Sequence, residues 1–175
     1  MYAKDNYDDN AEKYKKQYKE NFSMDFTDIN SKVLENGDFE SSMKFSSSNL
    51  IDRVGKKMII NPMLFLSKNS NEFDQTEVRK YPIDFGSPIT RIKKVSLEIP
   101  EGYVIEEMPK EKRIVTEDKE IAYTYSVEQK GNKLEVTTTT KINSSDYPKE
   151  YYPAFKQIWG VASKFENQVI SLVKK

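Results

Sequence analysis

The chain has 175 residues, of which 28 are lysine or arginine and 28 are aspartate or glutamate. This length suits one compact domain, and the balanced charge disfavours binding to nucleic acid or to an anionic lipid surface. The chain contains no cysteine and no histidine, which excludes thiol and imidazole catalysis, disulfides and zinc fingers. Isoleucine, valine and threonine number 34 against 12 leucine and alanine residues, so we expect β-structure to dominate.

The N-terminal segment predicts an amphipathic helix followed by a hairpin. Aromatic and apolar residues recur three or four positions apart over residues 7–22, with charged residues between them. We therefore assign residues 1–22 to a lead-in helix and residues 23–175 to a single domain. Apolar residues of 24–33 then lead to an Asn-Gly-Asp sequence at 36–38, which contains a strong hairpin signal. After it, Phe39, Met43 and Phe45 recur at even intervals.

The middle of the chain predicts further strands. Residues 50–66 indicate one or two strands, and Pro62 ends the second or marks a sheet edge. Residues 67–77 are polar, so we expect the longest exposed loop there and the internal boundary of the chain. Residues 79–86 are typical of an extended segment, and the alternation in residues 89–99 predicts a strand.

The clearest pattern predicts a hairpin with one solvent-exposed face. Residues 121–127 and 134–142 both alternate between apolar and polar side chains, and Lys130-Gly131-Asn132 separates them as a turn. We expect the other face to be buried, with Tyr123, Tyr125, Val127, Leu134 and Val136 on it.

The C-terminal segment predicts a helix and then a short strand. The helical stripe begins near Tyr151 or Tyr152, because a proline such as Pro153 is tolerated only in the first turn. Residues 168–173 indicate a strand. The predicted fold is mainly β (α+β), an antiparallel β-sandwich-like domain with an N-terminal helix and a long C-terminal helix whose Trp159 packs against the hairpin.

Candidate catalytic and metal-binding motifs are weak. Ser41 and Lys44 match the S-x-x-K pattern of serine acyl-enzymes, but on a strand residues three apart point to opposite faces. The carboxylate clusters lack the spacing of a calcium loop and are typical of solvated surface; they comprise Asp8, Asp9 and Glu12, then Glu106 and Glu107, then Glu117, Asp118 and Glu120. We therefore expect no catalytic residue, no metal site and no cofactor.

Aromatic residues leave one alternative function open. Tyr151, Tyr152, Phe155 and Trp159 lie at helical spacing, which favours a helix face that covers a sheet. If these rings were exposed they could stack on sugars, so the alternative is a carbohydrate-binding or cell-surface adhesion β-sandwich with a glycan partner. No stretch is long and apolar enough for a membrane span, and residues 1–9 have no signal-peptide pattern.

Several segments of the second half resemble one protein family. They read RKYPIDFG at residues 79–86, IPEGY at 99–103, EEMPK at 106–110 and NQVISL at 167–172, with residues 147–152 leading into the aromatic helix. They resemble the C-terminal, β-rich domain of bacterial transglutaminase-like proteins. In that family an N-terminal domain of unknown function precedes a transglutaminase- or protease-like core.

The resemblance implies a noncatalytic accessory or interaction domain. Its partner would be the transglutaminase-like core, in the same or a neighbouring chain, and the protein would be exported to the periplasm or cell envelope. The Cys-His-Asp residues of that core have no counterpart in a chain without cysteine or histidine. We therefore expect that this chain is not an enzyme.

Overall fold

Contacts divide the chain into two compact units, Met1–Ile51 and Asp52–Lys175. The predicted single domain of residues 23–175 thus spans both units, and the internal boundary expected at residues 67–77 is wrong because the division falls before Asp52. The structure is a computed structural model that describes residues 16, 19–20, 24–47, 50–68 and 71–175.

The first unit contains the predicted hairpin. Strands β1 (Met24–Val33) and β2 (Phe39–Ser47) pair antiparallel, with Phe26 opposite Phe45. Their ring centroids are 5.7 Å apart, a cross-strand aromatic contact of the kind that stabilises two paired strands. The predicted helix over residues 7–22 lies outside the described residues, apart from three helical positions, which are Lys16, Lys19 and Glu20.

The second unit consists of two four-stranded antiparallel sheets, one two-stranded sheet and one long helix. One sheet has the strand order β6-β10-β9-β8, another has the order β3-β4-β12-β7, and β5 pairs with β11. The β-rich α+β fold class is therefore confirmed. The strands are β3 (Asp52–Val54), β4 (Lys57–Ile60), β5 (Ile83–Asp84), β6 (Ile89–Glu98), β7 (Tyr103–Glu107), β8 (Lys112–Val115), β9 (Ile121–Lys130), β10 (Lys133–Ile142), β11 (Asp146–Tyr147) and β12 (Ile170–Lys174).

The predicted central hairpin is confirmed as β9 and β10. Its two-residue turn has Gly131 at φ +61°, as expected for the first central position of a type II′ turn. Val127 pairs with Val136, which places the apolar residues of both strands on one face. The five residues predicted for that face are all buried, namely Tyr123, Tyr125, Val127, Leu134 and Val136.

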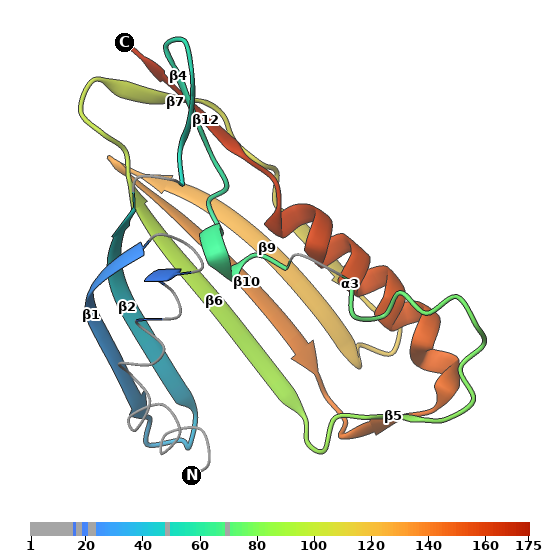
Figure 1. Cartoon of the computed structure of the whole chain (residues 1–175). Coiled ribbons are helices and arrows are strands. Elements are labelled where there is room, and N and C mark those ends of the chain that lie inside the picture. The colour runs from blue at the N-terminus through green and yellow to red at the C-terminus, as the bar shows by residue number, and fades with distance from the viewer. Residues whose placement is uncertain (1–15, 17–18, 21–23, 48–49, 69–70) are drawn as a thin grey trace. The chain divides into compact units, whose positions relative to one another are not determined.

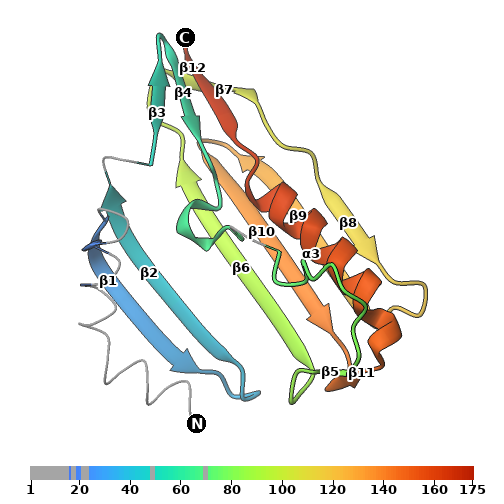
Figure 2. The same ribbon diagram turned by 45° about the vertical axis from the view of Figure 1, so that its right-hand side comes forward.

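The layer that covers this face is the helix α3 (Tyr152–Glu166). Figures 1 and 2 show α3 lying along the sheet β6-β10-β9-β8. Its apolar stripe packs into the core, where Trp159 lies edge-on to Phe155 with ring centroids 5.7 Å apart. The helix begins at Tyr152, as predicted, and Pro153 occupies its first turn.

The segment that follows β4 packs against the helix. It contains the 3-10 helix η1 (Leu64–Leu66), and a second 3-10 helix, η2 (Lys149–Tyr151), leads into α3. The prediction of an exposed loop at residues 67–77 is wrong at Phe73, which is buried and stacks on Phe155 with centroids 5.1 Å apart. Asn71 fixes the same segment by donating a hydrogen bond to the Lys156 carbonyl.

Two strands have no clear sequence signal. In β7, Tyr103, Val104 and Ile105 are consecutive rather than alternating, and β8 has only four residues. Both are outer strands of their sheets in the described structure. Within the described part of the chain, no helix has the length and apolar character needed to cross a bilayer.

Candidate functional site

The S-x-x-K motif lies where the sequence predicts, on a strand. Ser41 pairs with Ser31 and Lys44 pairs with Asp28, both within the β1–β2 hairpin. The two side chains are three residues apart on one strand, so they point to opposite faces. The structure does not bring them together.

The acidic cluster between β8 and β9 is part of a hydrogen-bond network rather than free surface. The Asp118 carboxylate accepts a hydrogen bond from the Tyr151 hydroxyl and another from the Glu120 backbone N–H. The Glu120 carboxylate accepts from the Ser144 hydroxyl at 3.1 Å. The Tyr151 bond connects the turn to the N-cap of α3. A side-chain hydrogen bond with Thr116 contributes most to lowering the pKa of Asp118, and the bonds from Tyr151 and Glu120 add to it.

The metal-site question can be answered only for the acidic clusters within the described residues. The first cluster, which includes Asp8, lies outside the described residues. Among the residues that the structure describes, no group of three or more Asp or Glu side chains is arranged to hold a metal ion. This search does not extend to the N-terminal acidic residues.

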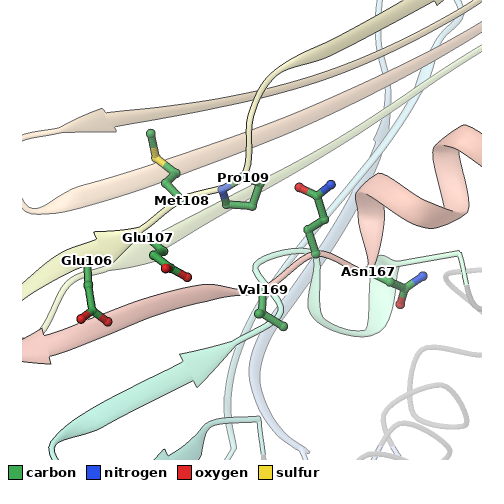
Figure 3. Close-up of a pocket in the computed structure, with 7 residues that line it drawn as sticks. Glu106, Glu107, Met108, Pro109, Asn167 and Val169 are labelled. Atoms are coloured by element: carbon green, nitrogen blue, oxygen red, sulfur yellow. The ribbon is translucent and has the colours of Figure 1, made fainter.

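An open hollow of about 690 Å³ lies beside the other acidic pair, Glu106 and Glu107. In Figure 3 the side chains of Glu106, Glu107 and Val169 point to one side, whereas Met108 points to the opposite side. Glu106 is already engaged, because its Oε2 accepts from the Ser171 hydroxyl at 2.8 Å and lies 2.7 Å from Lys57 Nζ. These partners lower the pKa of Glu106, with the contact to Lys57 contributing most.

The aromatic residues of α3 are core rather than a sugar platform. Tyr152, Phe155 and Trp159 are buried, and the Phe73 ring lies among them. The Trp159 indole N–H donates to the Glu72 carboxylate at 3.1 Å, which satisfies the polar edge of that ring. In the described structure these rings therefore form a closed cluster, and they give the carbohydrate-binding alternative no support.

The most unusual polar arrangement is a row that crosses the buried face of the large sheet. Strand pairing places Lys93, Thr138, Tyr125 and Lys112 side by side on β6, β10, β9 and β8. Such a face normally carries apolar residues, because burying polar groups costs free energy unless they are paired. Lys112 Nζ lies over the Phe165 ring of α3, 5.9 Å from its centroid.

Glu166, the last residue of α3, pairs with Lys93 of this row. Its side chain is 1% exposed, and Oε2 lies 2.8 Å from both Lys93 Nζ and the Lys68 backbone N–H. Lys93 also donates to the Leu66 carbonyl at 2.7 Å. One carboxylate therefore ties together the end of α3, the strand β6 and the segment that follows η1.

Two tyrosine hydroxyls lie close to the same carboxylate. Among the described residues, neither the Tyr123 hydroxyl, the Tyr125 hydroxyl nor Glu166 Oε1 has a hydrogen-bond partner. Burial raises the pKa of Tyr125 to about 12 and that of Tyr123 further, and the charge of Glu166 adds to both effects. Burial also lowers the pKa of Lys68.

This polar cluster, which we define as Lys93, Tyr123, Tyr125 and Glu166, is suited to holding elements together. Within it Lys93 pairs directly with Glu166, which is 1% exposed, and the open hollow lies elsewhere, beside Glu106 and Glu107. A buried ion pair of this kind depends on both partners for its stability. The sequence analysis missed the cluster, although Glu166 falls on the apolar stripe of α3 and Lys93 falls on the inward-facing positions of β6.

Comparison with known proteins places the second unit in a family. Residues 56–172 match the profile of the family described as a domain of unknown function with a solved structure, DUF3858. The chain is also similar to the crystal structure of a putative protease from Parabacteroides distasonis, with 17% identity and a TM-score of 0.51 over 67% of this chain. The match covers 23% of that longer chain. No curated protein matches this chain.

Proposed function

We propose that this chain, which belongs to the DUF3858 family, is a noncatalytic accessory module that packs on or positions a transglutaminase-like core. The observation that carries the proposal is the partial match to the putative protease. Only 23% of that chain corresponds to this fold, so in that protein the fold accompanies a much larger polypeptide.

The residues of the chain support the absence of catalysis. A thiolate mechanism needs a cysteine and a base that takes its proton, and the chain has neither cysteine nor histidine. The polar cluster at Glu166 is packed beneath α3, where Glu166 is 1% exposed and so is shielded from any substrate. The Ser41 and Lys44 side chains point to opposite faces of a strand.

The architecture supports a module that has its own core. Its core joins the large sheet, α3 and the segment that follows η1 into one buried cluster. A domain with its own core can be carried beside another domain without loss of its fold. The proposal also includes the C-terminal placement in the parent protein and the export to the periplasm or cell envelope that the sequence resemblance implies.

The test of this proposal has two parts. In the first, the purified chain is assayed for amine–glutamine transfer and for peptide hydrolysis, and we expect no turnover. In the second, the transglutaminase-like domain encoded in the same or the adjacent reading frame is produced separately and mixed with the chain, and we expect a complex on gel filtration. Turnover that survives repurification and is lost on one Ser, Asp or Glu substitution would refute the proposal, as would the absence of such a domain or of a complex.

A further inference from the structure

A loop between η1 and β5 is braced from within. The Gln75 backbone N–H donates to the Tyr152 hydroxyl at 2.9 Å, and Lys156 Nζ donates to the Gln75 carbonyl at 3.1 Å. Further along, the Arg79 side chain donates to the Tyr81 carbonyl at 2.9 Å and to the carbonyl of the next residue at 3.1 Å. The Arg79 guanidinium also lies over the Tyr152 ring, 5.6 Å from its centroid.

This bracing holds two large apolar side chains in solvent. Val78 is 84% exposed and Tyr81 is 76% exposed, the highest values among the exposed large hydrophobic residues of the described structure. A single exposed apolar residue is ordinary. Here, however, the Arg79 side chain holds the backbone at Tyr81 and the next residue, and the Gln75 bonds hold it before Val78. A partner would therefore find the loop already ordered and would lose less conformational entropy on binding.

The chemistry of the loop favours a folded protein as the occupant. Tyrosine is enriched among the residues that contribute most binding energy at protein–protein interfaces, because its ring offers a large contact area and its hydroxyl can form a hydrogen bond. The charged neighbours Glu77 and Lys80 have opposite signs and are both exposed, which disfavours a polyanion or an anionic membrane as the partner. In the similar putative protease, 77% of the chain lies outside the part that this fold matches, so protein is present to fill such a surface.

We propose that Val78 and Tyr81 form the surface by which this module docks on the transglutaminase-like core. This inference rests on the proposed accessory function and specifies which part of the module makes the contact. The core would offer an apolar pocket for the two side chains and a hydrogen-bond acceptor for the Tyr81 hydroxyl.

The absence of native cysteine makes a direct test possible. Val78→Cys introduces a single thiol at the proposed surface, and Ile92→Cys is the matched control, because Ile92 is 55% exposed on β6. Each variant is alkylated with a maleimide alone and with the separately produced transglutaminase-like domain in excess. We expect that domain to slow alkylation at position 78 by about tenfold when nine-tenths of the chain is bound, and to leave position 92 unchanged.

A second measurement requires no substitution at the surface. Hydrogen exchange of the wild-type chain should show slower exchange at the amides of residues 76–82 on adding the same domain. A complex that forms without protection in either experiment overturns the docking surface and leaves the accessory function intact. No complex refutes the accessory function itself. Protection of position 78 by anionic phospholipid vesicles in the absence of the domain would identify a membrane as the occupant and overturn the inference.

Discussion

Replacing Lys93 with methionine should strongly destabilise the second unit. The substitution keeps the length and apolar stem of the side chain but removes the cation that lies 2.8 Å from Glu166 Oε2. Glu166 is 1% exposed and, among the described residues, would retain only the Lys68 backbone N–H as a donor. Leaving a buried charge without its partner costs about 3 to 5 kcal/mol. Since Lys93 is 19% exposed and water can partly enter its place, we expect about 3 kcal/mol.

The assay is urea unfolding followed by the fluorescence of Trp159, the only tryptophan in the chain. Trp159 lies on the buried face of α3, within the hydrophobic core, and its fluorescence therefore reports on the folding of the second unit. The matched control is Lys94→Met, which changes the next residue of β6, an exposed lysine. It should alter the free energy of unfolding by less than about 0.5 kcal/mol, as is usual for surface substitutions.

A double substitution separates the ion pair from the shape of the site. Lys93→Met with Glu166→Leu removes both charges, so we expect the double variant to be more stable than Lys93→Met alone. If Lys93→Met unfolds within about 0.5 kcal/mol of the wild type, a range ordinary for surface residues, the assigned role of the Lys93–Glu166 pair is wrong. A double variant less stable than Lys93→Met would point to the packing of Glu166 rather than its charge.

Three further predictions concern the same unit. Because the folded-state pKa values of Tyr123 and Tyr125 lie above the unfolded value of 10, their stabilising contribution should be complete below pH 10 and decline as the pH rises toward 12. Tyr125 alone should account for about 2 kcal/mol of that decline, and the Y123F/Y125F variant should show a flatter alkaline limb in urea unfolding. Phe73→Ala should lower the free energy of unfolding by about 3 kcal/mol, because it removes a ring that stacks on Phe155. Trp159 emission should also shift to the red. Unchanged stability would mean that Phe73 does not anchor the loop. Gly131→Ala meets open space but a φ of +61°, so a loss of about 1 kcal/mol in thermal or urea unfolding is expected from backbone strain alone, and no loss would contradict the turn geometry.

The elements with strong local patterns could be predicted from sequence. The two strands around Gly131 have ten residues each, in which apolar and polar side chains alternate, and a two-residue turn sets their pairing. The start of α3 follows from Pro153 and the stripe behind it. In both places the residues that form the pattern lie within about twenty positions of one another in the sequence. Local physical chemistry is therefore sufficient to predict these elements.

The segment 67–77 shows why other parts could not be predicted. It is polar in sequence, yet Phe73 inserts into rings that lie about eighty positions later in the chain. The Lys93–Glu166 pair joins residues 73 positions apart. A lysine on the inner face of β6 and a glutamate on the apolar stripe of α3 are each visible as exceptions, but their spacing in sequence carries no information that they meet.

The position of β12 has a consequence for the order in which the protein can fold during synthesis. This strand lies between β4 and β7 in its sheet, yet it is translated after every other strand that the structure describes. Until residues 170–174 leave the ribosome, β4 and β7 have no neighbour that connects them, whereas the hairpin β9–β10 is already complete. Nascent chains arrested before residue 170 should therefore expose the edges of both strands, and such unpaired edges are where aggregation of incomplete chains begins.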